Sequence, residues 1–307
     1  MRYTLKHLEY FVATAAAGSI KLAAEKINIS APSISSAIAH LEDEFQVQLF
    51  IRRHAQGLIL TPAGKRIARE SKLVLRQADA LYSVAGELRN SVSGSLSIGC
   101  MVTLAPMIIP ELSQAFTSTH SDVELTIVEN THEQLIEQLR QVNIDAAISY
   151  DLSIPDDISF EPLASLPPQV LLSSDSPLAK KKKVKLSDLD GLPMILLDLP
   201  YSREYFLSLF QHEAMMPEIY ARSAHQEVVR AMVSNGFGFT ISNARPRNLT
   251  TLDGRKLVAV DLVGEHKPMI IGLATLLQEH KPMLLETFEK HCRKMISKRG
   301  IPGMLKV

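Results

Sequence analysis

Apolar residues near the start of the chain recur every three or four positions, which predicts helices rather than strands. A first helix is expected to end at Gly18, and Ser19 is a suitable N-cap for a short second helix. The chain breaks tightly at Asn28, and Ser30 can then cap a third helix that runs to about Phe45. The pattern therefore predicts three short helices in succession.

The next segment is predicted to be a small hairpin followed by a long helix. Residues 52–60 lack helical periodicity and contain Gly57, which favours a hairpin or wing. A helix restarts at Thr61-Pro62 and is expected to run to about Arg89, a length of about 42 Å. Its apolar positions have the heptad-like spacing of helices that pair with another helix: Ile67, Val74, Ala78, Leu81, Ala85 and Leu88. The alternative is a single helix that lies on its own domain.

After a Ser/Gly linker at 91–95, the pattern changes to strands that alternate with helices, which predicts βαβ units and a mostly parallel sheet. The expected strands are 95–100, 123–129, 144–150, 169–174, 193–198, 218–223, 239–242, 257–262 and 269–276. The expected helices lie near 105–118, 132–142, 202–214, 225–235 and 281–297. Because nine strands are many for one sheet and Pro-rich breaks occur at Pro162–Pro168 and Lys267-Pro268, we expect two lobes.

Composition adds a charge asymmetry to this picture. Residues 1–92 hold 12 Lys and Arg against 8 Asp and Glu, a net charge of +4, while the remainder holds 21 against 25, or −4. A basic N-terminal third suggests an anionic partner for that part. The two cysteines, Cys100 and Cys292, and the ten histidines show no metal-ligand spacing, so no metal or cofactor is expected.

Three features of the sequence indicate the cellular compartment of the protein. The N-terminus lacks the apolar core of a signal peptide, and no window reaches the length of a membrane span. Two cysteines make no disulfide framework, which fits a reducing compartment. We therefore expect a cytoplasmic protein without a membrane partner.

The third helix has two unlike faces. Its apolar side chains fall on one side: Ile34, Ile38, Leu41 and Phe45. The opposite side carries Pro32, Ser36, Ala39 and Asp43, flanked by Ser33 and His40. The N-terminal half of this outer side is small and polar, as a helix must be to enter a major groove. The alternative is a short surface helix with no partner.

Two segments of the N-terminal part are distinctive: "LEYFVATAAAGSIKLAAEKINISAPSISSAIAHLEDEFQVQLFIRR" at 8–53 and "LTPAG" at 60–64. On these segments, residues 1–65 resemble the N-terminus of LysR-type transcriptional regulators. After residue 100 the resemblance rests more on the order of strands and helices than on sequence motifs. It implies an α+β multidomain protein: a winged helix-turn-helix (1–60), a linker and dimerisation helix (61–90) and a two-lobed α/β, periplasmic-binding-protein-like effector domain (94–297). From the strand count and the Pro-rich breaks, we expect the first lobe at 94–165 and 268–297 and the second at 166–267. The Lys, Arg, Gly and Pro content of 298–307 predicts a flexible tail.

The same resemblance implies the DNA contacts. The third helix would be the recognition helix, and the wing at 52–60 would contact the minor groove or the backbone. The expected contact residues are Ala31, Pro32, Ser33, Ser36, Arg52 and Arg53, with His54 as a weaker candidate. The family often has Gln in place of Ala31 and Arg in place of Ser36. Since these long side chains are missing, we expect DNA recognition to depend less on direct base contacts and more on phosphate contacts and DNA shape.

The effector site is expected in the cleft between the lobes, where strands end and helix N-termini supply N–H groups. Four such junctions carry polar residues: Thr103, Thr131, Ser202 and Gln226. Tyr201, Arg203 and Tyr205 are further candidates. Hydroxyls, an amide and helix N-termini favour an anionic or polar organic effector such as a carboxylate. The alternative for Thr131 and Ser202 is simple helix capping.

Other motifs are assigned no function. The lysine run at 180–185 is interpreted as a solvated loop, and Cys100 as a small buried residue rather than a redox sensor. No nucleophile and base can be paired, so an enzyme is not expected. The prediction is a homo-oligomeric regulator, dimeric or tetrameric, on double-stranded promoter DNA, with RNA polymerase as a further candidate partner. An effector would shift the lobes and change the spacing of the DNA-binding modules. The alternatives are a small-molecule carrier and an α/β enzyme.

Overall fold

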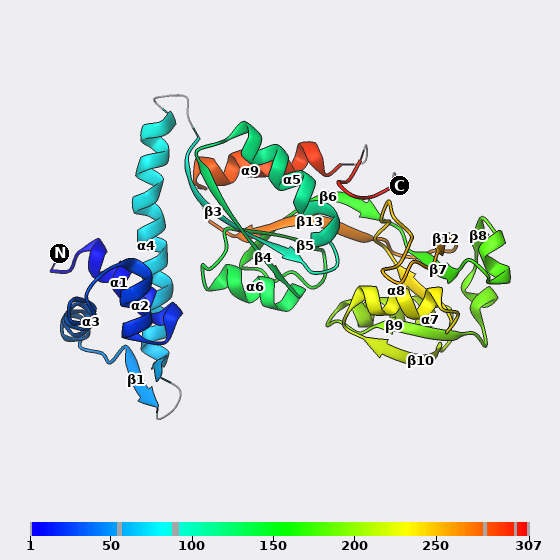
Figure 1. Ribbon diagram of the computed structural model, residues 1–307, viewed down its shortest axis with the longest axis horizontal. Coiled ribbons are helices and arrows are strands. Elements are labelled where there is room, and N and C mark those ends of the chain that lie inside the picture. The colour runs from blue at the N-terminus through cyan, green and yellow to red at the C-terminus, as the bar shows by residue number, and fades with distance from the viewer. Residues whose placement is uncertain (1, 54–56, 88–91, 279–280, 298–299, 306–307) are drawn as a thin grey trace. The chain divides into compact units, whose positions relative to one another are not determined.

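The computed structural model describes residues 2–53, 57–87, 92–278, 281–297 and 300–305 (Figure 1). The chain divides into two compact units, Met1–Gly94 and Ser95–Val307. None of the helices in the described ranges combines the length and the apolar character that crossing a membrane requires.

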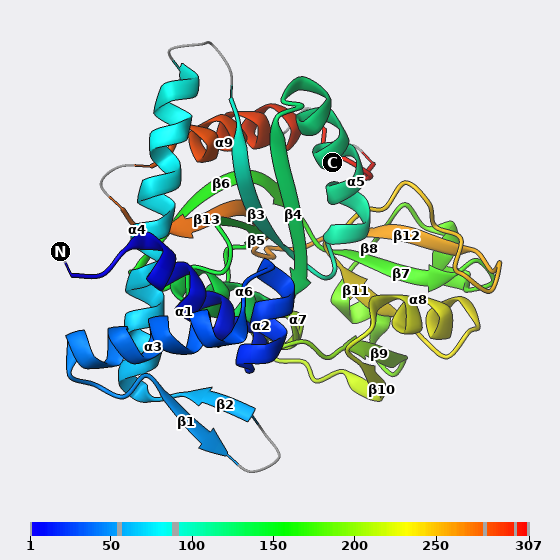
Figure 2. The ribbon, with the colours of Figure 1, turned by 60° about the vertical axis from the view of Figure 1, so that its left-hand side comes forward.

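The first unit consists of three short helices, a two-stranded wing and one long helix (Figure 2). The elements are α1 Leu5–Ala17, α2 Ile20–Ile27, α3 Ala31–Phe45, β1 Phe50–Arg53, β2 Gly57–Leu60 and α4 Pro62–Glu87. The side chains of Phe11, Ile34, Leu41 and Leu49 are fully buried in its core. The predicted helices and the predicted wing are confirmed.

Local capping explains where the three short helices begin and end. Each begins after a hydroxyl that accepts a hydrogen bond from a main-chain N–H: Thr4 from His7, Ser19 from Leu22 and Ser30 from Ser33. Each ends at a residue with a positive φ: Gly18, Asn28 and Gln46. The signals at Ser19, Ser30 and Gly18 are confirmed as caps.

The "LTPAG" segment is a short, tightly packed connection between the wing and α4. The hydroxyl of Thr61 accepts a hydrogen bond from the Gly64 N–H at 2.8 Å, which caps the helix. A Cβ on Gly64 would lie 2.1 Å from the main-chain oxygen of Leu49, so only glycine fits there. The Glu42 carboxylate accepts hydrogen bonds from the N–H groups of Leu49 (2.7 Å) and Phe50 (3.3 Å). These contacts fix β1 against α3 and α4.

The second unit contains two lobes, which share no sheet among the described residues (Figure 1). Lobe I has a five-stranded sheet in the order β4-β3-β5-β13-β6. Its elements are β3 Gly94–Met101, α5 Ala105–Thr119, β4 Val123–Asn130, α6 His132–Arg140, β5 Ala146–Tyr150, β6 Ile158–Leu166, β13 Met269–Leu276 and α9 Met283–Met295. Its core includes the fully buried rings of Phe116 on α5 and Phe288 on α9, 5.2 Å apart and perpendicular.

Lobe II has the strand orders β11-β7-β12-β8 and β10-β9, which a bridge between Met194 and Phe239 connects. Its strands are β7 Gln169–Ser173, β8 Lys183–Val184, β9 Pro193–Leu197, β10 Glu218–Ser223, β11 Thr240–Ser242 and β12 Leu257–Leu262. Its helices are α7 Ser202–His212 and α8 Gln226–Ser234, with short 3-10 turns at Pro177–Lys180 and Leu186–Leu189.

Two expectations about these sheets are wrong. The sheets are mixed rather than mostly parallel, because β13 returns from lobe II and enters lobe I antiparallel to both β5 and β6. Strands β6 and β8 were not predicted. The expected break at Pro162–Pro168 begins later, since β6 continues through Pro162 to Leu166. Pro162 is tolerated because β6 is an edge strand with a register shift at this point.

The C-terminal segment 300–305 is packed, which corrects the expectation of a flexible tail. Ile301 and Met304 are only 5% and 4% exposed. The main-chain oxygen of Gly303 accepts a hydrogen bond from the Arg247 N–H at 3.0 Å. The expectation rested on the Lys, Gly and Pro content of the tail, whereas the two apolar side chains decide its placement.

Replacing Met304 with alanine is expected to lower the free energy of unfolding of the second unit by about 2 kcal/mol, because a buried side chain is lost. Leu305→Ala is the matched control, since Leu305 is 48% exposed and its loss should change stability by less than about 0.5 kcal/mol. Urea unfolding followed by circular dichroism measures both. Equal stability of the two variants would mean that the segment contributes no anchoring.

Candidate functional site

The outer face of α3 is exposed where the sequence predicted a DNA-reading surface. Ile34, Ile38 and Leu41 are buried against the other helices, while the side chains opposite them are exposed. Pro32, Ser33 and Ser36 are exposed and line a groove between α3 and α1. Ala31 is half-buried and packs against the core. The predicted division of this helix into a buried and an exposed face is confirmed.

The wing presents one more predicted contact residue. Arg52 is exposed on β1. Arg53 ends β1, its side chain is outside the described part of the structure, and His54 lies outside the described residues. The wing is held to the end of α1 by a hydrogen bond from the Leu58 N–H to the Gly18 oxygen at 2.8 Å. A Cβ on Gly57 would lie 2.6 Å from that oxygen, and its φ is +76°, so this contact requires glycine.

A pocket in the second unit is lined by residues of both lobes. The lining residues are Thr103, Tyr150, Leu171, Leu197, Phe206, Gln226, Val229, Arg230, Thr240, Ile241, Ser242, Asn243, Ala244 and Met269. Its free space is about 30 Å³, enough for about one or two water molecules. The pocket is therefore closed to an organic molecule unless the lobes separate.

Two polar groups of this pocket are buried without a full hydrogen bond among the described residues. The Oγ1 atom of Thr103 has no partner with hydrogen-bond geometry, although it lies beside the hydroxyl of Tyr150. The Oδ1 atom of Asn243 also has none, while its Nδ2 donates to the Leu166 oxygen (2.8 Å) and to the Tyr205 hydroxyl (2.9 Å). Buried polar groups without partners are costly, so both point to a ligand or bound water.

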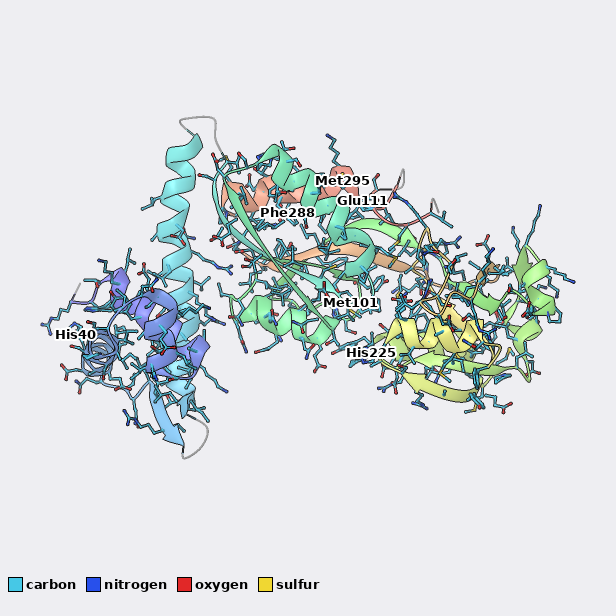
Figure 3. The ribbon with its side chains drawn as sticks, in the orientation of Figure 1. His40, Met101, Glu111, His225, Phe288 and Met295 are labelled. Atoms are coloured by element: carbon cyan, nitrogen blue, oxygen red, sulfur yellow. The ribbon has the colours of Figure 1, made fainter. Side chains whose placement is uncertain are left out.

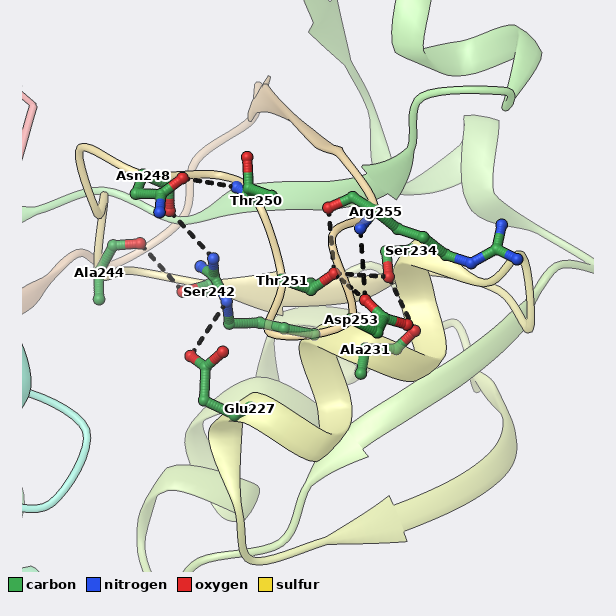
Figure 4. Close-up of polar contacts among 11 residues, drawn as sticks. Glu227, Ala231, Ser234, Ser242, Ala244, Asn248, Thr250, Thr251, Asp253 and Arg255 are labelled. Atoms are coloured by element: carbon green, nitrogen blue, oxygen red, sulfur yellow. Dashed lines mark hydrogen bonds and ion pairs between the residues drawn. The ribbon is translucent and has the colours of Figure 1, made fainter.

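Arg230 contributes a buried guanidinium to the same pocket. The residue is 4% exposed, and its Nη2 donates to the Asn248 oxygen at 3.0 Å. Its Nε lies 3.2 Å from Oε1 of Glu227 but lacks hydrogen-bond geometry, and the Glu227 side chain is 51% exposed (Figure 4, where Glu227 and Asn248 are labelled). The positive charge is thus only partly compensated at the pocket.

The polar contacts of the loop after β11 hold the end of α8 in place (Figure 4). The hydroxyls of Ser234 and Thr251 lie 3.2 Å apart. Thr251 also hydrogen-bonds to the Asp253 carboxylate and to the Arg255 oxygen. Because α8 carries both Gln226 and Arg230, this network fixes the position of the pocket's polar side chains.

The four residues proposed for the effector do not all meet in this pocket. Thr103 and Gln226 line it, whereas Thr131 and Ser202 are not among its lining residues. Thr131 is the N-cap of α6, and its N–H and hydroxyl both donate to Oε1 of Gln134 (3.2 and 3.1 Å). Ser202 is the buried first residue of α7. Ligand contact by any of the four remains a prediction.

Of the further candidates at the start of α7, Tyr201 makes a contact that joins the lobes, while Arg203 and Tyr205 make contacts within lobe II. The rings of Tyr201 and His132 lie 5.5 Å apart, edge to face, and Tyr201 adopts φ +63°, a strained backbone conformation for a tyrosine. Burial lowers the pKa of His132. The Tyr205 hydroxyl donates to the Lys267 oxygen at 2.8 Å, and burial raises the pKa of Tyr205 to about 12. The Arg203 guanidinium is engaged by Asp198 and Glu204.

Arg230, Asn243 and Tyr150 were missed by sequence reasoning. Arg230 follows Gln226 by four residues, so a helical wheel of α8 would have placed both on one face. Asn243 comes from a loop and Tyr150 from a fully buried strand, and no local signal distinguishes either residue.

The two cysteines are buried and chemically shielded. Cys100 and Cys292 are both fully buried, and burial raises the pKa of each thiol. Neither provides an accessible thiolate. The described residues also contain no cluster of His, Cys, Asp and Glu that could hold a metal ion.

Comparison with protein families accounts for most of the chain. Residues 5–65 match the family described as "Bacterial regulatory helix-turn-helix protein, lysR family". Residues 89–297 match the family described as "LysR substrate binding domain". The first match lies within the first unit, and the second match begins near the end of the first unit and covers most of the second.

Individual relatives agree with this assignment. HinK, a LysR family transcriptional regulator from Pseudomonas aeruginosa, is 36% identical, with a TM-score of 0.65 over 96% of this chain and 99% of that chain. A full-length OxyR variant from the same species is 25% identical, with a TM-score of 0.74 over 94% and 97%. A hydrogen peroxide-inducible genes activator from Pectobacterium carotovorum is 28% identical over 77% of this chain and 78% of its own length. The chain belongs to the LysR family of DNA-binding transcriptional regulators, which carry an effector-binding domain, form oligomers and are not enzymes.

Proposed function

We propose that this regulator responds to a small anionic organic effector, such as a carboxylate, which binds in the pocket between the two lobes. One observation carries the proposal: a buried, partly compensated guanidinium lines the same pocket as two buried polar groups that lack full hydrogen bonds. An anionic group would pair with Arg230, accept a hydrogen bond from Thr103 and leave Asn243 to bind a donor of the ligand.

The size of the pocket favours a conformational response. With free space of about 30 Å³, the pocket admits an organic acid only if the lobes move apart. The ligand would therefore bind one arrangement of the lobes better than the other, which is the requirement for a ligand to shift a conformational equilibrium. The shift would reach DNA by changing the spacing of the DNA-binding modules in an oligomer.

An organic effector is favoured over direct peroxide sensing by a cysteine. Some relatives are named as hydrogen peroxide-inducible genes activators. Thiol oxidation by peroxide needs an accessible cysteine with a low pKa. Cys100 and Cys292 are buried, and burial raises the pKa of both thiols. We therefore do not extend the peroxide response to this chain.

The DNA would be contacted by α3 and the wing. The proposed contact residues are Ala31, Pro32, Ser33, Ser36, Arg52 and Arg53. The exposed, small outer face of α3 supports entry into the major groove, and Arg52 on β1 supports a contact of the wing with the backbone.

Self-association would use α4. Val74 and Leu81 are 43% and 70% exposed and stand seven residues apart on this helix, the spacing of a helix-pairing face. We propose the division 1–60 for DNA binding, 61–90 for dimerisation and 94–297 for the effector, with lobes at 94–165 plus 268–297 and at 166–267. The protein would act in the cytoplasm without enzymatic activity.

The test is a thermal-shift screen of small carboxylates, amines and neutral sugars on the full chain. A ligand that binds the folded state raises the unfolding temperature, and we expect carboxylates to do so. Arg230→Met keeps the volume of the side chain and removes its charge, and should weaken binding of an active carboxylate at least about thirtyfold. Arg222→Met is the control, because Arg222 is 51% exposed on β10.

Three outcomes would contradict the proposal. Stabilisation only by amines would reverse the assigned charge of the effector. An unchanged response of Arg230→Met would remove Arg230 from the site. A carrier rather than a regulator would bind the carboxylate but show no salt-dependent affinity for DNA in a gel shift.

A further inference from the structure

A polar groove continues the outer face of α3 onto the first turn of α1. It has a volume of about 750 Å³, and its lining residues include Lys6, His7, Pro32, Ser33, Ser36 and His40. Three of these residues belong to the proposed DNA-reading face, and His40 lies further along α3 (Figure 3, where His40 is labelled). Ser33 and Ser36 therefore share this groove with residues of α1.

Two histidine rings in the groove contact each other edge to face. The rings of His7 on α1 and His40 on α3 lie 5.0 Å apart with an interplanar angle of 73°. The Nε2 atom of His40 lies 2.8 Å from the Arg2 main-chain oxygen. Since a carbonyl oxygen only accepts hydrogen bonds, Nε2 carries the proton of the neutral ring, and Nδ1 is left to take up another. The Nδ1 atom of His7 is buried without a hydrogen-bond partner among the described residues.

The lining of the groove favours an anion. Lys6 is exposed and is the only lysine or arginine side chain among the lining residues, and none of the nine lining residues is a carboxylate. Of the other ionisable groups nearby, Tyr10 lines the groove and Arg2 holds His40 through its main-chain oxygen. On α3, Asp43 and Glu44 follow His40 by three and four residues without lining the groove.

We propose that this groove binds a phosphate of the DNA backbone beside the recognition helix, with Lys6, His7 and His40 as its contacts. The proposal rests on the proposed DNA contacts of α3, because the duplex that α3 reads brings its phosphates to the edge of the same helix. A protonated imidazole donates from both nitrogens, so a phosphate stabilises the charged form of the pair. Binding of DNA is therefore coupled to uptake of a proton.

The geometry limits how many protons are taken up. Two imidazolium rings 5.0 Å apart would repel each other, which disfavours a second positive charge beside the first. We expect uptake of about one proton per bound module rather than two. Affinity for DNA should then rise by up to about tenfold for each unit by which the pH falls, within the range where histidine changes its charge.

The test uses the full-length protein and a short mixed-sequence duplex labelled with fluorescein, because phosphate contacts do not depend on base sequence. Anisotropy titrations between about pH 6 and pH 8 compare the wild type with His40→Gln, His7→Gln and Lys6→Gln. His212→Gln and Lys182→Gln are the controls, since both residues are exposed in the second unit. Circular dichroism verifies folding, and the exposed His40 and Lys6 carry the test if His7→Gln fails to fold.

We expect the affinity of the wild type and of His212→Gln to rise as the pH falls, and His40→Gln to flatten this dependence. Lys6→Gln should lower the slope of log affinity against log salt by about one, and Lys182→Gln should not. If His40→Gln keeps the pH dependence and Lys6→Gln keeps the salt slope, the phosphate site is wrong. Ser36→Glu separates the two proposals: normal binding by that variant overturns the DNA face of α3 itself.

Discussion

Replacing Ser36 with glutamate is expected to reduce affinity for duplex DNA at least about a hundredfold, because it places a carboxylate where base edges and phosphates approach. Ser36 is exposed in the middle of the outer face of α3, between the exposed side chains of Ser33 and His40. The substitution leaves the buried face of the helix intact. Anisotropy with a promoter fragment at fixed salt measures the loss.

Two control variants distinguish the effect of the added charge at position 36 from the effect of losing the serine hydroxyl. Ser36→Ala removes only a hydroxyl and should weaken binding by less than about tenfold. Ser187→Glu adds the same charge at an exposed position of the second unit and should leave affinity nearly unchanged. If Ser36→Glu binds as well as Ser187→Glu, the outer face of α3 does not read DNA.

Replacing Phe116 with alanine is expected to destabilise the second unit by about 3–5 kcal/mol, the usual cost of deleting a buried phenyl ring. The Phe116 ring on α5 is fully buried and contacts three other rings: Phe288, His120 and His291. Phe288 and His291 belong to α9, so the cavity would open between two helices of lobe I. Chemical unfolding with urea measures the change.

Phe237→Ala is the matched control for this loss. Phe237 is 45% exposed in lobe II, and its ring lies tilted beside that of Tyr220, which is itself 58% exposed. Removing a partly exposed ring forfeits little buried area, so we expect a change below about 1 kcal/mol. Comparable losses in the two variants would show that the α5–α9 contact is not a core of lobe I.

The helices of the first unit could be predicted because their signals are local. Ser19 and Ser30 cap helices through hydroxyls that accept from N–H groups three residues later, and Gly18 ends a helix by its own φ. The apolar period of α3 likewise depends only on its own residues. Each of these features is decided within one or two helical turns.

Sheet order and the pocket depend on contacts between distant segments. The antiparallel entry of β13 is decided by the crossover from lobe II, about 100 residues after β6. Arg230 and Asn243 become pocket residues only because α8 and the loop after β11 meet Thr103 from lobe I. The search for polar residues at strand ends identified Thr103 and Gln226. It could not predict which of the strand–helix junctions lie opposite each other in the fold.

The packed C-terminal segment makes the two margins of the pocket mechanically unequal. Gly303 lies against Met107 of α5 in lobe I. The same segment hydrogen-bonds to Arg247 of lobe II, which forms an ion pair with Glu111 of α5 at 2.6 Å. These contacts connect lobe I and lobe II on that side. Helix α6 lies on the other side of β13 from α5 (Figure 1). The ring of His132, the first residue of α6, contacts that of Tyr201 in lobe II. Entry of a ligand would therefore swing the lobes about the tethered margin, with the aromatic pair as the first contact to part.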